Sequence, residues 1–319
     1  MSKIHVLVKK SLERNSNRLS ILRYVPFSIR LGKIYRDHVR LIAWYANASE
    51  KARRSFHYDR LNKILDYSYH NIPFYEEFYS SKNYNPKDFK RLEDFLDVPI
   101  INKNTLKQYT LDQRSIMLPG ATLSNTGGTT GNPLDFRLDK HCFHREWAYM
   151  HNIWANLGYN YLDTKLTFRG MNIGTTPLRY NVVHNEYIVN AYLDLDLILD
   201  AISKLAVNKK IKYLHGYPSS IYEFCKYMQA KNLSSEDVFQ GHLNGVLFGS
   251  EFPAPQYRSL IEKVLKVPTL SEVKFSGRVD INDLLTRARK VKEKENKINL
   301  VFFGLISALV VIVGIILSF

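Results

Sequence analysis

The stretch IKYLHGYPSSIYEF, residues 211–224, joins a short apolar run to a helix-like run through a turn. Ile211–Leu214 has the length and the β-branched and aromatic content of a buried strand. The turn HGYPSS contains a glycine and a proline, which end regular structure. Ser220 with Glu223 matches a capping box, in which the serine accepts from a free helix amide and the glutamate reaches back. The stretch therefore predicts a strand, a tight turn and a helix.

The same order of strand, turn and helix recurs on both sides of this stretch. Lys165–Phe168 and Tyr187–Val189 are short strand candidates, and Val246–Phe248 is a buried strand candidate that ends at Gly249-Ser250-Glu251. A helical run, YRSLIEKVL, follows two prolines shortly afterwards. Strands that alternate with helices predict an α/β fold with a parallel sheet.

Helical patterns dominate the part of the chain before these strands. Leu61, Ile64, Leu65 and Tyr69 recur at helical spacing. Pro73 then predicts the end of this helix, since proline cannot continue the hydrogen-bond ladder. A further short helix is expected after Asn104, in the segment FKRLEDFLDVPIINKNTLKQY.

A glycine- and threonine-rich segment, LSNTGGTTGNPLDF, occupies residues 123–136. Gly127, Gly128 and Gly131 let the backbone approach an anion closely. Thr126, Thr129 and Thr130 add hydroxyl donors, and together these groups can form an anion-binding nest. The spacing matches neither a Walker A loop nor a GxGxxG loop. Two interpretations remain, a phosphate loop and an ordinary glycine-rich turn.

The net charge of +15 over 319 residues is concentrated at the two ends of the chain. Residues 1–60 hold about 14 Lys and Arg against about 4 Asp and Glu, whereas residues 61–282 are nearly neutral. A protein that follows a nucleic-acid backbone would spread its basic surface over the central fold. The distribution therefore favours a membrane surface over nucleic acid as the partner of the basic ends.

The last residues, INLVFFGLISALVVIVGIILSF (298–319), are apolar and uncharged. At about 1.5 Å per residue such a helix is long enough for a hydrocarbon core of about 30 Å. Six Lys and Arg precede it within residues 287–297, which predicts a cytoplasmic main body by the positive-inside rule. The sequence thus predicts a C-terminal single-pass anchor in the cytoplasmic membrane.

The beginning of the chain and its cysteines indicate no secreted protein. The first residues, MSKIHVLVKKSLERNSNRLS, lack a long apolar core and a cleavage site. Cys142 and Cys225 are far apart and form no CxxC pattern, which fits a reducing compartment.

These patterns divide the chain into four regions. Residues 1–115 are expected to be basic and mainly helical, 116–267 to form an α/β nucleotide-binding region, 268–297 to be a basic linker, and 298–319 to be the transmembrane anchor.

Four stretches, in order, resemble one branch of the adenylate-forming (AMP-binding) enzymes. They are KILDYSYHNIPFYEEFY, LEDFLDVPIINKNTLKQY, TGGTTGNPLDF, and the pair HGYPSSIYEF and GVLFGSEFPAPQYRSLIEKV. The branch is that of phenylacetate–coenzyme A ligase-like proteins, which includes capsular polysaccharide biosynthesis proteins. The resemblance covers roughly residues 58–267.

The resemblance implies an ATP-dependent ligase with Mg²⁺ as a second cofactor. A carboxylate attacks the α-phosphate of ATP to form an acyl-adenylate, and coenzyme A or another acceptor then takes the acyl group. By position, Thr126–Gly131 would hold the β- and γ-phosphates, Gly249, Ser250 and Glu251 would pass the adenine ring, and the acyl pocket would be lined by His215, Gly216, Tyr217 and Pro218. A role in surface polysaccharide assembly is also implied.

Three departures from this pattern bear on activity. Asn132 replaces a lysine of the loop, and no YGxxE or TGD segment follows Leu270. Gly277-Arg278-Val279-Asp280 matches a hinge motif of the family only by chance. The sequence therefore predicts a truncated and impaired enzyme, by natural truncation or by a frameshift near Leu270. A non-catalytic, membrane-anchored scaffold or binding protein that retains the α/β shell remains the alternative.

Two clusters of potential metal ligands are better explained as ordinary helix residues. His141, His144 and His151 lie within HCFHREWAYMH, but no further ligands stand at useful spacing. The acids of NAYLDLDLILD, at positions 194, 196 and 200, predict a helix N-cap and an exposed helix face.

Overall fold

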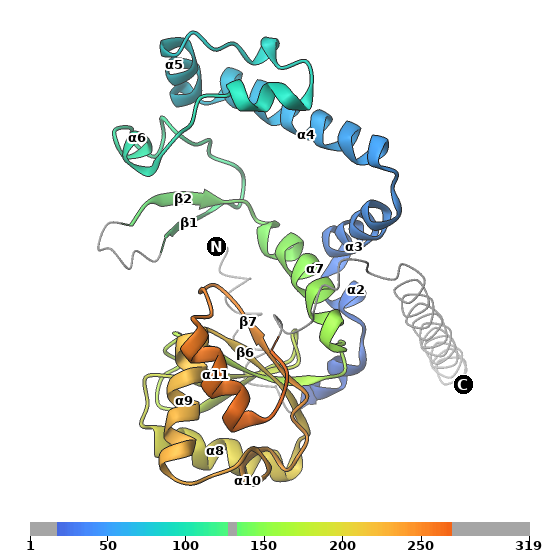
Figure 1. Ribbon diagram of the computed structural model, residues 1–319, viewed down its shortest axis with the longest axis vertical. Coiled ribbons are helices and arrows are strands. Elements are labelled where there is room, and N and C mark those ends of the chain that lie inside the picture. Colours follow the sequence, from blue (N-terminus) through green and yellow to red (C-terminus); the bar gives the residue numbers. More distant parts are fainter. Residues whose placement is uncertain (1–17, 127–132, 270–319) are drawn as a thin grey trace, which may run out of the picture. The chain divides into compact units, whose positions relative to one another are not determined.

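The computed structural model describes residues 18–126 and 133–269, which form two compact units (Figure 1). Within these residues, unit 1 comprises 31–153 and unit 2 comprises 18–30 and 154–269. The range 116–267, expected from the sequence to form one α/β region, is shared between the two units. Among the described residues, no helix has the length and apolar content needed to span a membrane. The predicted linker, apart from Pro268 and Thr269, and the predicted anchor lie outside the described residues.

Unit 1 is mainly helical and carries one β-hairpin (Figure 1). Its elements are α3 (Gly32–Asn47), α4 (Glu50–Asn71), α5 (Pro73–Ser81), the 3₁₀ turns η2 (Pro86–Asp88) and η3 (Leu92–Asp97), α6 (Lys103–Lys107), β1 (Thr122–Asn125), β2 (Asp135–Leu138) and α7 (Cys142–Trp154), of which the last residue, Trp154, belongs to unit 2.

The helix boundaries of unit 1 follow local capping chemistry. Ser49 caps α4 by accepting a hydrogen bond from the amide of Ala52 (3.2 Å). Pro73 ends the pattern of α4 as predicted and occupies the first turn of α5, where no amide is needed. Leu65 enters a small core with Tyr79 and Phe89, whereas Ile64, expected on the same face, is 60% exposed.

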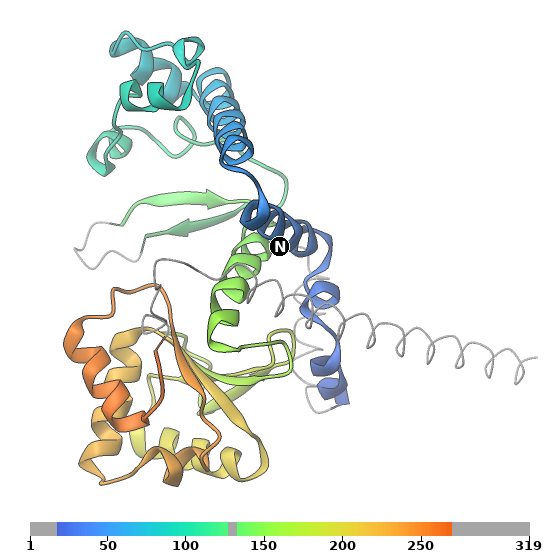
Figure 2. The ribbon, with the colours of Figure 1, turned by 45° about the vertical axis from the view of Figure 1, so that its right-hand side comes forward.

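Unit 2 contains a five-stranded sheet and several helices (Figures 1 and 2). Its elements are η1 (Arg18–Tyr24), α2 (Phe27–Arg30), η4 (Ala155–Leu157), β3 (Thr164–Arg169), β4 (Leu178–Asn181), β5 (Glu186–Asn190), α8 (Leu195–Asn208), β6 (Ile211–Gly216), α9 (Pro218–Ala230), α10 (Ser235–Phe239), β7 (Gly245–Phe248) and α11 (Pro255–Leu265).

The strand order of this sheet is β4-β5-β3-β6-β7. Strands β5, β3, β6 and β7 are parallel, and β4 pairs with β5 in the antiparallel direction at one edge. The predicted α/β class is therefore correct for unit 2. All four strand candidates from the sequence are strands in the structure.

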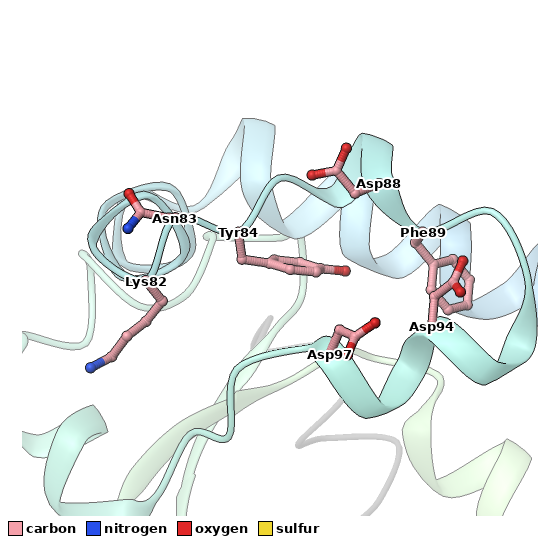
Figure 3. A pocket seen from close by; sticks show the side chains of 7 residues that line it. All are labelled: Lys82, Asn83, Tyr84, Asp88, Phe89, Asp94 and Asp97. Carbon is pink, nitrogen blue, oxygen red and sulfur yellow. The ribbon is translucent and has the colours of Figure 1, made fainter.

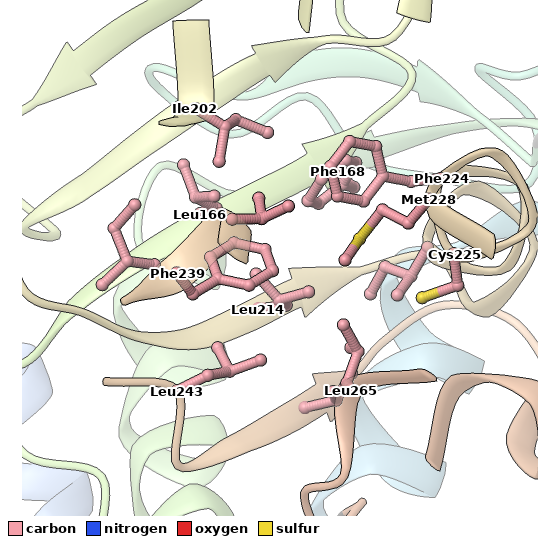
Figure 4. Packing of buried hydrophobic residues seen from close by; sticks show 14 of the residues in the cluster. Leu166, Phe168, Ile202, Leu214, Phe224, Cys225, Met228, Phe239, Leu243 and Leu265 are labelled. Atoms are coloured by element: carbon pink, nitrogen blue, oxygen red, sulfur yellow. The ribbon is translucent and has the colours of Figure 1, made fainter. Parts of the chain in front are cut away.

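The two faces of the sheet differ in chemistry because side chains alternate along each strand. Leu166 and Phe168 of β3, Leu214 of β6 and Val246 of β7 point into one apolar core, which residues of α8, α9, α10 and α11 complete (Figure 4). Helix α9 packs along β3 and β6 and against α11, while α8 lies beside α10.

The opposite face of the sheet buries aromatic and charged side chains instead. Lys165 of β3 pairs in register with Glu186 of β5 and with Tyr213 of β6, and all three are at most 2% exposed. Helix α2 contributes Arg30, which stacks on Phe27 (4.4 Å from the guanidinium carbon to the ring centroid). Burial on both faces explains why these strands read as short, mostly apolar runs in the sequence.

Candidate functional site

The parallel strands of unit 2 direct their carboxyl ends to one edge of the sheet. From β3 the chain continues to β4 and β5 on one side, and from β6 it continues to β7 on the other side. Neighbouring strands whose connections leave in opposite directions form a switch point, where α/β proteins bind ligands. The predicted segments His215–Pro218 and Gly249–Glu251 end the adjacent strands β6 and β7 at this edge.

Gly216 allows the backbones of β3 and β6 to meet at this edge. Its φ angle is 149°, and a Cβ atom built there would lie 2.0 Å from the carbonyl oxygen of Phe168. That oxygen accepts a hydrogen bond from the amide of Tyr217 (3.1 Å), while the oxygen of Gly216 accepts from the amide of Gly249 (3.0 Å). Only glycine fits this position, and the three strand ends are joined through it.

Glu251 joins the segment after β7 to the beginning of α9. Its carboxylate oxygen Oε2 accepts from the amide of Ser219 (3.2 Å) and from the Ser219 hydroxyl (2.7 Å). Ser250, directly before it, has a positive φ of 65°, which turns the chain back. A carboxylate at a helix N-terminus satisfies a free amide and interacts favourably with the helix dipole.

This arrangement corrects the predicted capping box of α9. The helix begins at Pro218, and its N-cap residue Tyr217 makes no side-chain hydrogen bond. In the first turn of α9, the amide of Ser219 donates to Glu251, which is distant in the sequence. Local sequence spacing cannot reveal this contact. Glu223 contacts Lys226 instead.

His215 lies beneath the edge rather than on its surface. Its side chain is 4% exposed and packs on Trp154, with 4.6 Å between ring centroids. The missing side chain of Gly249 makes room for the imidazole, since a Cβ there would lie 3.3 Å from Nε2. Burial, together with the charges of Lys165 and Arg169, holds the pKa of His215 well below its ordinary value. The imidazole is therefore neutral at pH 7.

Three of the four predicted pocket residues are buried, namely His215, Gly216 and Pro218. The fourth, Tyr217, is partly exposed. Tyr217 lies against Gly170, and the hydroxyl of Tyr192 donates to the Gly170 carbonyl oxygen (3.2 Å). Tyr192 is 66% exposed.

Large side chains follow all four parallel strands at this edge. Phe252 is 82% exposed after β7, and Met171 after β3 is also exposed; Tyr192 follows β5 and Tyr217 follows β6. The sequence prediction included only Tyr217 of this set. A search for large apolar residues within four positions of a strand end would have found the others.

A buried ion pair lies near the opposite ends of the strands. The Lys165 ammonium is 3.4 Å from Glu186 Oε2 and donates to the His184 carbonyl oxygen (3.0 Å), and Thr167 donates to Glu186 (2.6 Å). Burial lowers the pKa of Lys165, and the adjacent ammonium lowers the pKa of Glu186 although burial alone would raise it. Lys165 and Glu186 are both buried, so these two groups lie away from any ligand at the surface.

The hairpin of unit 1 carries the predicted phosphate loop between its strands. Strands β1 and β2 are antiparallel, with Thr122 opposite Leu138 at one end and Asn125 opposite Asp135 at the other. Thr126 closes the hairpin, because its amide donates to the Leu134 carbonyl oxygen (3.0 Å) and its hydroxyl accepts from the Leu134 amide (3.0 Å). The Thr126 amide is thus occupied. Gly127, Gly128, Thr129, Thr130 and Gly131 lie outside the described residues.

The potential metal ligands behave as ordinary helix residues. Asp194 caps α8 by accepting from the amide of Asp196 (2.8 Å), and Asp196 and Asp200 pair with surface lysines. In α7, His151 is buried and its Nδ1 lies 3.0 Å from the hydroxyl of Tyr35. No group of three His, Cys, Asp or Glu side chains within the described residues is arranged to hold a metal ion.

One cavity of unit 1, of about 240 Å³, has the wrong charge for a nucleotide. Figure 3 shows the Tyr84 ring between Asp88 and Asp97, and Asp94 also lines the wall. These carboxylates would repel phosphate.

The fold is shared with solved structures of 2-hydroxyisobutyryl-CoA ligase. In the postadenylation state with R3-HIB-AMP this ligase matches 69% of the chain with a TM-score of 0.52 and 16% identity. In the thioesterification state with 2-HIB-AMP and CoA the TM-score is 0.51 at 17% identity over 69% of the chain, and in an open conformation with the same ligands it is 0.50 at 16% identity over 68%. The chain shares its fold with this ligase over about two thirds of its residues.

This likeness covers 48% of the ligase in each comparison, so the chain spans about half the length of that enzyme. At these sequence identities the likeness establishes the fold. No protein-family model matches the sequence, and no match is found among curated proteins.

Proposed function

We propose that this protein binds ATP and a carboxylate and activates the carboxylate as an acyl-adenylate. The observation that carries the proposal is the shared fold with a ligase solved with 2-HIB-AMP, together with the meeting of the 215–218 and 249–251 segments at the switch-point edge. In the reaction a carboxylate oxygen forms a bond to the α-phosphorus, and the bond from that phosphorus to the bridging oxygen of pyrophosphate breaks.

The residues at the edge suit a flat, uncharged ring. Aromatic surface that is partly or largely exposed is offered by Tyr217, Tyr192 and Phe252. Aromatic side chains bury a nucleobase efficiently by stacking. We assign adenine to this edge, with the carboxylate of Glu251 turned toward Ser219 as the group that holds the 249–251 segment in place.

The assignment of the phosphates to residues 126–131 rests on the sequence resemblance alone. ATP supplies the leaving pyrophosphate, and Mg²⁺ would reduce the negative charge of its phosphates.

The acceptor and the cellular role are finer parts of the proposal. Coenzyme A is the acceptor favoured by the ligase structures, two of which contain CoA with 2-HIB-AMP. Surface polysaccharide assembly and a cytoplasmic membrane location rest on the sequence resemblance and on residues 298–319.

Exchange of pyrophosphate into ATP tests the proposal directly. The full chain with Mg²⁺ and a panel of carboxylates, including 2-hydroxyisobutyrate, should show weak exchange that depends on one class of carboxylate, because the sequence predicts a truncated and impaired enzyme. Gly128→Asp should abolish it, because a carboxylate in the loop repels phosphate, whereas the neutral Gly128→Asn of similar size should retain part of it.

Nucleotide binding separates the remaining outcomes. Saturable AMP and ATP binding without exchange would indicate a binding protein that retains the α/β shell. If neither nucleotide binds and no carboxylate supports exchange, the proposed function is wrong.

A further inference from the structure

A second cavity of unit 1, of about 230 Å³, lies between α5, the turn that precedes the hairpin, and strand β2. Its polar lining comes from Tyr75, Arg114, Ser115, Arg137 and Asp139, and apolar side chains including Ala121 complete the wall. The volume is below the 300–1,000 Å³ of most ligand pockets, which fits a compact ion or one end of a larger molecule.

Two arginines of this cavity are held by contacts between residues 109–115 and strand β2. Arg114 donates from Nε to the Tyr109 carbonyl oxygen (3.3 Å) and from Nη1 to the Asp135 carbonyl oxygen (2.6 Å). Arg137, on β2, donates from Nη1 to the carbonyl oxygen (3.2 Å) and hydroxyl (2.8 Å) of Ser115. Both guanidinium groups are therefore held in place before any ligand arrives, which reduces the entropy lost on binding.

The charges around the cavity do not balance. Arg137 pairs with Asp112, and Asp139 pairs with Arg145. The contacts of Arg114 are to neutral carbonyl oxygens, and no carboxylate of the described residues pairs with it. Three arginines and two aspartates therefore leave one excess positive charge, on Arg114. The recorded contacts of Arg114 use its Nε and Nη1, and Nη2 can donate to a ligand.

We infer that this cavity binds a phosphate group, either inorganic phosphate or the terminal phosphate of an ester. Arginine matches phosphate because its planar group donates two parallel hydrogen bonds to two oxygens. The Tyr75 hydroxyl lines the same space and can add a donor, whereas the Ser115 hydroxyl already donates to the Leu111 carbonyl oxygen (2.6 Å). Asp139 would oppose an anion, but its negative charge is offset by Arg145. The site is distinct from the 126–131 loop and does not depend on the proposed function.

Calorimetric titration of the full chain with inorganic phosphate and with methyl phosphate, at constant ionic strength, tests the inference. The wild-type protein should bind at least one of them saturably, and the preferred ligand identifies the source of the phosphate group. Arg114→Gln should weaken binding by about tenfold or more, because it removes a charge-assisted hydrogen bond.

Two further variants keep the test independent of folding and of the glycine loop. Ala121→Asp introduces a carboxylate at the wall and leaves the Arg114 contacts intact, so it should weaken binding about as much as Arg114→Gln, while Ala121→Asn should not. Gly128→Asp, which disables the loop, should bind phosphate as the wild type does. Absence of saturable binding, or binding that is lost in Gly128→Asp but kept in Ala121→Asp, would overturn the inference.

Discussion

Gly216 is the residue whose chemistry is most narrowly fixed by the structure. A Cβ atom at this position would overlap the carbonyl oxygen of Phe168 at 2.0 Å, so no side chain fits without moving β3 or β6. We predict that Gly216→Ala lowers the free energy of unfolding by more than about 3 kcal/mol. Urea unfolding of the full chain, followed by circular dichroism, measures this change.

Gly241 provides the matched control for this substitution. It also has a positive φ, 67°, but a Cβ there would meet no atom within 4 Å. Gly241→Ala should therefore cost only the conformational penalty of about 1 kcal/mol. Equal effects at the two positions would show that the contact with Phe168 is unimportant.

His184 gives unit 2 a defined dependence on pH. Burial lowers the pKa of His184 from 6.5 to about 3. Between these values the unfolded chain binds the proton and the folded chain does not, so stability is complete above pH 6.5 and falls as the pH decreases toward 3. This histidine alone should reduce the free energy of unfolding by about 2 kcal/mol between pH 7 and pH 5.

The measurement is the slope of stability against pH from urea unfolding at several pH values. His215, whose pKa is also lowered, contributes in the same direction. His184→Gln should reduce the slope by about one proton and leave the contribution of His215. A slope that is unchanged in the variant would contradict the burial of a neutral imidazole at position 184, whatever the variant does to stability at pH 7.5.

At the scale of elements, β3 and β5 are held together by a buried ion pair. Lys165 and Glu186 face each other in register, and both are almost completely buried. We predict that Lys165→Met costs about 3–5 kcal/mol, because Glu186 would remain buried without its counter-charge. Chemical unfolding of the full chain provides the measurement.

The double variant Lys165→Met, Glu186→Gln tests the physical reason. Removing both charges should recover much of the loss, because the desolvation cost disappears together with the attraction. Lys204→Met serves as a control, since its pair with Asp200 is exposed and such pairs contribute less than about 1 kcal/mol. A double variant as unstable as the single one would show that the Lys165 contacts other than Glu186 determine stability.

The four parallel strands of unit 2 could be predicted from sequence because each of them is buried on both faces. Lys165–Phe168, Tyr187–Val189, Ile211–Leu214 and Val246–Phe248 all lie within strands of the structure. The edge strand β4 was not predicted, because LRYN alternates weakly and pairs on one side only.

Less of the candidate site than of the fold could be predicted from the sequence. The 215–218 and 249–251 segments were predicted as site segments, and the structure places them on adjacent strand ends. The link from Glu251 to Ser219 could not be predicted, since 32 positions separate the two residues. The aromatic residues Tyr192 and Phe252 were missed because single exposed aromatic residues carry no spacing pattern.

At the scale of the whole molecule, two sets of apolar residues differ in the kind of partner they suit. The exposed aromatic residues at the sheet edge belong to the described fold and suit a small planar ligand. The run of residues 298–319 is of another kind, because it is uncharged and long enough to cross a bilayer. The basic residues of 1–60 and 287–297 can add attraction to anionic lipid, which falls with salt.

Membrane extraction distinguishes a spanning segment from this electrostatic attraction. We predict that the full chain stays with membranes through washes with high salt and with alkaline carbonate, and is released by detergent. Replacing Val310 and Ile312 by lysine places two charges near the centre of the run, at about 2.5–3.5 kcal/mol each, and should release the protein into the carbonate wash. Replacing the same residues by leucine keeps the run apolar and should change nothing. Release of the wild-type protein by salt alone would mean that the basic ends hold it at the membrane surface and that residues 298–319 do not span the bilayer.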